Sequence, residues 1–229
     1  GAKARDSRAL TEEEFMNVID ESRKKVLPRD RDLHNFAHPA FLLTQFHLDG
    51  RLDDIALLDT DELRPYPKQK HILQASIRSS KNIHKKSDWH WQCLIGCLNP
   101  AICVIIALAA YVGYFEDEDD LKKYPNRITE RPEGEKKKEP VLPGFFRLGK
   151  SLRWGKGAIS GRLKHILRVI LKLIGNVSTH SIRKTSTETM QNNKVPRDSS
   201  NQRGRWRSHT TNKKRNSSNI YYKIDFLFL

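Results

Sequence analysis

Three histidines, His34, His38 and His47, lie in the first quarter of the chain, and imidazole is the commonest metal ligand in proteins. His34 and His38 are four residues apart, a spacing that places two side chains on one face of a helix. Pro39 would interrupt that helix, and no fourth ligand is placed nearby. We therefore expect neither a metal site nor a cofactor.

The sequence also lacks the patterns that usually accompany catalysis. It contains no nucleophile motif, no glycine-rich loop that could hold a phosphate and no pair of carboxylates in an apolar setting. We therefore predict no catalytic residues and no enzyme activity.

An acidic segment carries the clearest recognition motif. Asp54, Leu57 and Leu58 form a D-x-x-L-L pattern in a stretch that ends at Pro65 and Pro67. In an extended peptide, such a motif places one carboxylate on a basic adaptor surface and two aliphatic side chains in neighbouring pockets. We predict that these three residues bind a trafficking adaptor. The alternative is one more helical turn, with both leucines in the core.

The three cysteines lie in or beside one apolar stretch, so they indicate no disulfide framework. Cys93 and Cys97 are four apart and face the same side of a helix, which makes them candidates for lipid attachment. The alternative is that the cysteines are simply small apolar residues.

That apolar stretch, residues 89–115, contains no lysine, arginine, aspartate or glutamate. It is long enough to cross about 30 Å of hydrocarbon as a helix, and tryptophans and tyrosines stand at its two ends. We predict a transmembrane helix with a kink at Asn99 and Pro100. The alternative is a buried helix of a folded core.

Before this stretch, the sequence predicts two short helices. Thr11 and Glu14 form a capping box, and apolar residues recur on one helical face until Pro28. Residues 36–48 form a second apolar segment, with Pro39 near its first turn. We expect these helices to pack as a small hairpin.

The last third is strongly basic. Residues 144–229 hold 19 lysines and arginines and 3 acidic residues, within a chain whose net charge is +15. Residues 144–175 predict a cationic amphipathic helix that ends at Gly175 and lies in a membrane interface. Residues 176–229 show no periodicity, and we expect a disordered tail. Asn176 and Asn216 would accept N-glycans if the tail is lumenal.

The predicted fold is therefore mostly α. It comprises a helical cytosolic head (residues 1–63), a basic juxtamembrane segment (64–88), one transmembrane helix (89–115), a charged proline-containing spacer (116–143), the cationic amphipathic helix (144–175) and the disordered basic tail (176–229).

The order of acidic dileucine, basic run and late apolar stretch resembles the C-terminal region of consortin, over about residues 10–125. The resemblance implies a single-pass membrane protein of the trans-Golgi network and secretory pathway, with the plasma membrane as a further location. Its implied partners are membrane lipids, connexin cargo and Golgi-localised, gamma-ear-containing clathrin adaptors. Nucleic acid is expected to be an unlikely partner. The alternative function is a membrane-active cationic effector that works through residues 144–175.

Overall fold

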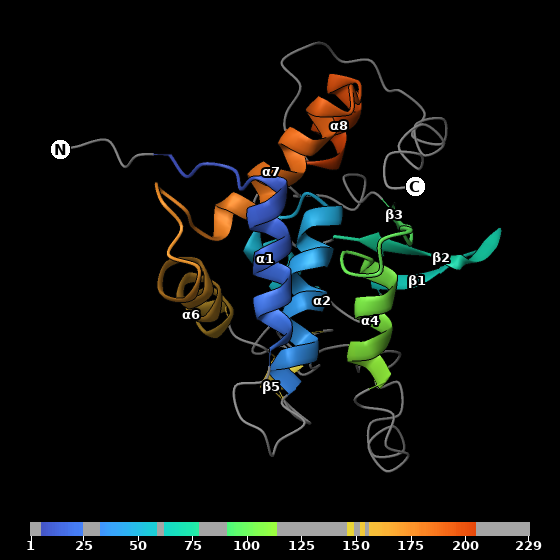
Figure 1. Ribbon diagram of the computed structural model, residues 1–229. Helices are drawn as coiled ribbons and strands as arrows, with labels where there is room; N and C mark the ends of the chain where they lie inside the picture. Colours follow the sequence, from blue (N-terminus) through green and yellow to red (C-terminus); the bar gives the residue numbers. More distant parts are fainter. Residues whose placement is uncertain are drawn as a thin grey trace, which may run out of the picture.

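The computed structural model describes residues 6–24, 33–58, 62–77, 91–113, 146–148, 152–153 and 156–204. Within these ranges the chain is helical with a small sheet (Figure 1). The elements, in chain order, are α1 (Glu12–Arg23), α2 (Leu33–His47), α3 (Leu52–Ala56), β1 (Leu63–Tyr66), β2 (Gln69–Ser76), β3 (Trp91–Leu94), α4 (Val104–Gly113), β4 (Arg147–Leu148), β5 (Leu152–Arg153), α6 (Lys156–His165), a π-helical turn η3 (Ile166–Ile170), α7 (Thr179–Asn192) and α8 (Arg197–Arg203).

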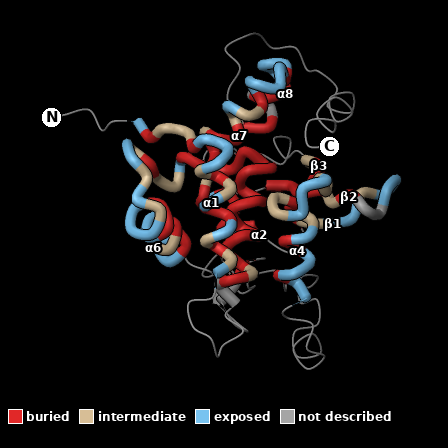
Figure 2. Tube along the Cα trace, viewed as in Figure 1, coloured by how far each residue is buried: buried red, intermediate tan, exposed pale blue. Residues whose placement is uncertain are grey.

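Helix α2 lies at the centre of the fold and is buried along nearly its whole length (Figure 2). Its sequence is mostly apolar, as expected of a helix that is surrounded by other elements, and Thr44 and Gln45 are buried with the apolar residues. It packs against α1, α4, α7 and α3. Pro39 lies inside the helix rather than in its first turn, because α2 begins at Leu33.

The predicted capping box is confirmed at the start of α1. The backbone N–H of Glu14 donates to Thr11 Oγ1 at 3.1 Å, and the Glu14 carboxylate accepts from the Thr11 N–H at 2.9 Å. The apolar face of α1 packs against α2, where the rings of Phe15 and Phe46 stack with centroids 4.5 Å apart. The two predicted head helices therefore pack side by side.

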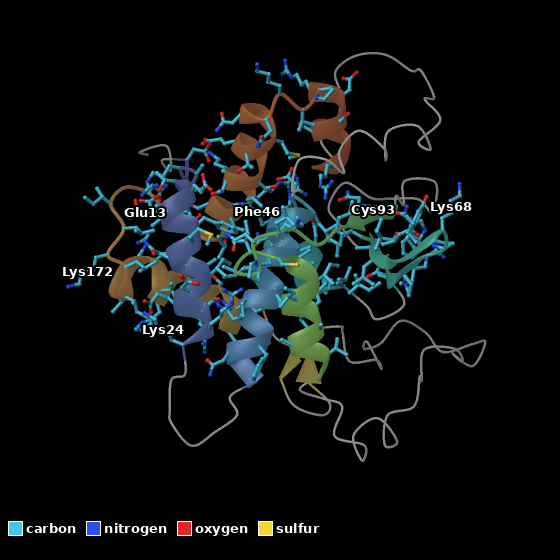
Figure 3. All side chains as sticks on the ribbon, turned by 45° about the vertical axis from the view of Figure 1, so that its right-hand side comes forward. Glu13, Lys24, Phe46, Lys68, Cys93 and Lys172 are labelled. Carbon is cyan, nitrogen blue, oxygen red and sulfur yellow. The ribbon has the colours of Figure 1, made fainter. Side chains whose placement is uncertain are left out.

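The sheet is antiparallel, with strand order β1-β2-β3. Strands β1 and β2 form a hairpin that projects from the helices, and Lys68 lies in its turn (Figures 1 and 3). Strand β3 pairs with β2 so that Leu94 lies opposite Leu73 and Cys93 opposite Gln74. A shorter hairpin, β4 and β5, pairs Leu148 with Leu152.

The prediction of a transmembrane helix over residues 89–115 is wrong. Among the described residues, none of the helices is both long and apolar enough to cross a membrane. The apolar stretch instead supplies β3, a turn at Asn99 and Pro100, and the ten-residue α4. Helix α4 buries Leu108 and Tyr111 in the core beside α2. An apolar run can equally serve a buried strand and a buried helix, and composition does not distinguish these uses.

The cationic amphipathic helix over residues 144–175 is also corrected. Strands β4 and β5 lie within it, and its helical part, among the described residues, is α6 and η3. Ile159, Leu163 and Leu167 are fully buried in the shared core. The apolar face therefore packs against protein, chiefly α1, α3 and α7, rather than against a bilayer.

The predicted disordered tail begins too early. Helices α7 and α8 lie within it, and Ile182 of α7 is fully buried in the core. The fold is therefore not a helical head with a membrane anchor, because its last described helices belong to the same core as the first. The predicted spacer (116–143) and residues 205–229 lie outside the described residues.

Candidate anion site between alpha3 and alpha7

A tight turn at the end of α2 delivers Arg51 to the surface. Asp49 has a φ of 46°, a left-handed conformation that aspartate tolerates better than most residues. The Gly50 N–H donates to the carbonyl of Gln45 at 3.0 Å, which closes the end of the helix. The chain then enters α3 with Arg51 at the N-cap position and with the Asp54 carboxylate accepting its backbone N–H at 3.1 Å.

Arg51 breaks the usual preference at an N-cap, where a short polar side chain accepts a backbone hydrogen bond. Its own side chain makes no such bond. The Nη1 atom is buried and has no hydrogen-bond partner within the part of the chain that the structure describes. A buried guanidinium nitrogen without an acceptor is costly, so this arrangement favours a bound oxygen ligand.

The start of α7 is a second place where the charge pattern is unusual. Ser178 caps the helix by accepting from the His180 N–H at 3.2 Å, and the first turn contains no acidic residue. His180, Arg183 and Lys184 instead place basic groups near the positive end of the helix dipole, which disfavours cations and attracts anions. The His180 ring is exposed and makes no hydrogen bond to a described residue.

One side chain of α2 joins these two places. Gln45 Nε2 donates to the carbonyl oxygen of Gly50 at 3.3 Å and to that of Thr179 at 3.3 Å. The residues that follow these carbonyls are Arg51 and His180. The backbone that presents Arg51 therefore meets the backbone that presents His180, and we call this place the Arg51–His180 site.

Buried contacts hold the neighbouring cation of α7 in place. Arg183 is 6% exposed, and its Nε lies 3.9 Å from Oδ1 of the fully buried Asp49. Asp49 Oδ1 also accepts from Thr187 Oγ1 at 3.2 Å. The other end of the Arg183 guanidinium donates to the carbonyl of Gly204. The turn that carries Arg51 is thus tied to the helix that carries His180.

Arg203, at the end of α8, connects α2 to the sheet. Its Nε donates to the carbonyl of His47 at 2.6 Å, and its Nη2 donates to the carbonyl of Cys93 at 3.3 Å. The Arg203 carbonyl in turn accepts from Gln92 Nε2 at 3.0 Å. Figure 3 shows Phe46, at the end of α2, and Cys93 of β3 in this part of the fold.

The histidine at the end of α2 is held neutral. Burial and, to a smaller extent, the positive charge of Arg203 lower the pKa of His47 to about 3, against an opposing effect of the Ile102 carbonyl. His47 Nε2 lies 3.4 Å from that carbonyl oxygen, so the neutral ring donates this hydrogen bond. His47 therefore serves as a buried packing residue rather than as a group that titrates near neutral pH.

The structure brings two of the three predicted adaptor-binding residues into the fold. Asp54 is 2% exposed and Leu58 is fully buried, whereas Leu57 is 41% exposed. Adaptor binding requires all three side chains to lie outside the fold. The alternative of a further helical turn agrees with α3, although only one of the two leucines enters the core.

The other predicted modification sites are spread over the fold. Cys93 is buried in β3 and Cys97 is half-exposed in the following turn. Asn176 is half-buried, and its carbonyl accepts from the Arg8 N–H at 2.9 Å. Asn216 lies outside the described residues.

The three histidines do not come together as metal ligands. His38 and His47 are both buried in α2, and the His34 side chain lies outside the described part. In the described ranges, no group of three histidine, cysteine or acidic side chains could hold a metal ion.

The fold of this chain is similar to that of a solved site-specific recombinase. The solved structure is XerH site-specific recombinase bound to its difH substrate in a pre-cleavage complex, with a TM-score of 0.58 and 11% sequence identity. The match covers 93% of this chain and 49% of XerH, so this chain spans about half the length of the recombinase. No family model and no curated protein sequence matches the chain.

This likeness, together with the absence of a spanning helix in the described ranges, overturns the predicted function. The chain is not supported as a single-pass trafficking protein that sorts connexin cargo through a clathrin adaptor, nor as a membrane-active effector. The same findings contradict the predicted location in the membrane, the trans-Golgi network and the secretory pathway. They also contradict the predicted partners, which were lipids, a clathrin adaptor and connexin. The expectation that nucleic acid is an unlikely partner is also wrong, since the matched recombinase was solved on its DNA substrate.

The prediction that the chain is not an enzyme is weakened, because the matched structure is an enzyme. At this identity the likeness establishes the fold alone. The resemblance to consortin is untouched by these comparisons.

Sequence reasoning missed Arg51, His180 and Arg183. A detectable pattern was present in residues 178–184, where a serine cap is followed by three basic residues in a helix that should begin with acidic ones. It was overlooked because this stretch was assigned to a disordered tail.

Proposed function

We propose that this chain binds duplex DNA through backbone phosphates at the Arg51–His180 site and acts on a DNA phosphodiester bond, as the catalytic half of a recombinase-type enzyme. The observation that carries the proposal is Arg51 Nη1, a buried cationic donor without a protein acceptor among the described residues, on a turn that Gln45 ties to the start of α7. The recombinase fold supports it.

The chemistry of the site suits a phosphate. A guanidinium offers paired donors to two phosphate oxygens, and a helix N-terminus adds a fixed positive partial charge. The nearby carboxylates are already engaged, because Lys156 pairs with Asp53 at 2.7 Å and Asp54 accepts the Arg51 N–H. They therefore do not fill the place of the anion. The net charge of +15 would favour approach to DNA at low salt.

The same groups could promote phosphodiester transfer. When a hydroxyl attacks phosphorus, negative charge grows on the non-bridging oxygens, and a fixed cation such as Arg51 stabilises that charge. The bond from phosphorus to the departing sugar oxygen then breaks, and that oxygen takes up a proton. His180, exposed at the start of α7, is a side chain of the type that donates such a proton.

Binding is tested by titrating a fluorescent duplex with the wild type and with Arg51→Ala, at several salt concentrations. We expect a loss of about tenfold or more in affinity and a salt slope reduced by about one phosphate contact. Lys164→Ala is the matched control, because it removes one exposed charge from α6 and should change affinity less than about twofold. Absent wild-type binding, or equal losses in both variants, would refute the proposal.

Cleavage is tested separately with a nicked duplex that traps products. A covalent protein–DNA adduct on a denaturing gel indicates a nucleophile on the chain, and free cleaved DNA indicates water. The variants Tyr221→Phe and Tyr222→Phe test whether either tyrosine is the nucleophile, because the adduct should be lost when that tyrosine is replaced. His180→Gln should keep DNA binding and lose most cleavage. Binding without cleavage in the wild type would retain the phosphate site and reject the enzyme.

A further inference from the structure

A turn between β3 and α4 folds two cysteines toward each other. The carbonyl of Asn99 accepts from the Ile102 N–H at 3.2 Å, and Asn99 Oδ1 accepts from the Ala101 N–H at 2.9 Å. The chain therefore reverses direction over residues 99–102. Cys97 precedes this reversal and Cys103 follows it, so the two thiols lie on opposite arms of one turn.

The contacts around the turn place the two sulfur atoms together. Cys103 Sγ lies 3.5 Å from the point that a Cβ atom on Gly96 would occupy, directly beside Cys97 in the chain. Burial raises the pKa of the Cys97 thiol, and the Cys103 side chain, within hydrogen-bonding reach, raises it further. Cys97 Sγ also donates to the carbonyl of Asn99 at 3.2 Å.

We infer that Cys97 and Cys103 are a site of disulfide formation, in which a glutathione disulfide converts the two thiols into an intramolecular bond that closes the turn between β3 and α4. The site is distinct from the Arg51–His180 site and does not depend on the proposed function. Both residues are thiols in this structure.

The difference in exposure sets the order of events. Cys97 is half-exposed, whereas Cys103 is 3% exposed. The Cys97 thiolate attacks one sulfur of the glutathione disulfide and releases one glutathione thiolate, which leaves a mixed disulfide on Cys97. The Cys103 thiolate then attacks the Cys97 sulfur and releases the second glutathione. Two protein thiols are oxidised, and one glutathione disulfide is reduced to two glutathiones.

The bond would brace a turn that is already docked on the first two helices. The carbonyl of Ala101 accepts from Arg23 of α1, and that of Ile102 lies 3.4 Å from His47 Nε2 of α2. Because the closed loop is short, we expect the oxidised protein to unfold only a few degrees above the reduced protein. We expect the rate of oxidation to rise about tenfold per pH unit around pH 8, since the thiolate is the reacting form.

The test incubates the full chain with glutathione redox mixtures, blocks remaining thiols by alkylation and maps the products by peptide mass spectrometry. The expected product is a Cys97–Cys103 disulfide in the wild type and in Cys93→Ser, the matched control that removes the neighbouring buried cysteine. In Cys103→Ser the reaction should stop at the glutathione adduct of Cys97.

Three outcomes would overturn the inference. The wild type could accumulate the same Cys97–glutathione adduct as Cys103→Ser, which would show that the buried thiol does not resolve it. Cys97 could pair with Cys93 instead. Both thiols could also stay reduced in a strongly oxidising mixture in which an unfolded control, the same chain in urea, is fully oxidised.

Discussion

Two sets of cations lie near the end of α2, and they differ in what surrounds them. Arg183 and Arg203 are buried and donate to protein carbonyls, and Arg183 also faces Asp49. Arg51 and His180 have no such hydrogen-bonding acceptors in the described part of the chain. The difference separates basic side chains that hold the fold together from basic side chains that remain available to a ligand. The following predictions test this separation, from the largest expected effect to the smallest.

Arg203→Ala should cause the largest loss of stability. The change removes hydrogen bonds to the carbonyls of His47 and Cys93 and leaves both acceptors in a buried place. We expect the free energy of unfolding to fall by about 3–5 kcal/mol, measured by urea denaturation. Arg197→Ala, an exposed arginine on the same helix, should cost less than about 0.5 kcal/mol. Similar losses in both would contradict a structural role for Arg203.

Asp49→Asn should be the next most damaging change. Asparagine keeps the shape and tolerates the left-handed backbone at this position, so the variant removes mainly the negative charge beside Arg183. We expect a loss of about 2–4 kcal/mol, because a buried guanidinium is left without its counter-charge. Asp53→Asn, which affects only the exposed pair with Lys156, is the control. A loss below about 1 kcal/mol at Asp49 would show that the pair contributes little.

Acid should destabilise the protein through His47. The folded pKa is about 3, below the ordinary value of 6.5, so the unfolded chain binds the proton more tightly. Stability is therefore fully present above pH 6.5 and falls as the pH drops from 6.5 toward 3, by about 1.4 kcal/mol per pH unit. At pH 5 the loss is about 2 kcal/mol.

The measurement compares urea unfolding of the wild type and His47→Gln between pH 7.5 and 4.5. The variant lacks this titration, so its stability should fall less steeply, while the carboxylates contribute equally to both proteins. Parallel pH profiles would contradict this prediction, because they would show that the pKa of His47 in the folded state is close to its ordinary value.

Arg51→Ala should have the smallest effect on stability, in contrast to its large expected effect on DNA affinity. The change removes a buried nitrogen atom that lacks an acceptor, so the free energy of unfolding should change by less than about 1 kcal/mol. Thermal unfolding of the variant without DNA checks this. A loss as large as that of Arg203→Ala would place Arg51 with the structural cations.

Local features of the fold could be predicted from the sequence because their causes are local. The capping box of Thr11 and Glu14 depends on residues three apart, and it forms as predicted. The apolar segment that becomes α2 was found for the same reason. Residues 89–115 show the limit of such predictions. An apolar stretch of this length is compatible with a transmembrane helix and with the interior of a folded protein. The pairing of β3 with β2 shows that it belongs to the protein interior.

The candidate site could not be predicted in the same way. Arg51 and His180 are far apart in the sequence, and the fold links the backbone before each of them through hydrogen bonds to Gln45 of α2. A contact between such distant segments produces no periodicity or motif in the sequence. The basic residues at the start of α7 can be read from the sequence. They indicate an anion site only when the segment is known to be a helix that packs on α2.

The bridge made by Gln45 has a consequence for how the protein is made. A nascent chain that has reached the end of α4 already contains Arg51, yet it contains neither Thr179 nor His180. Contacts between such distant segments form late in folding, because a long loop must close before they contribute. The site is thus absent throughout most of translation, and it is completed only when the penultimate described helix docks on α2. A ribosome-bound chain, or one truncated before α7, would contain Arg51 without the link through Gln45 that completes the Arg51–His180 site.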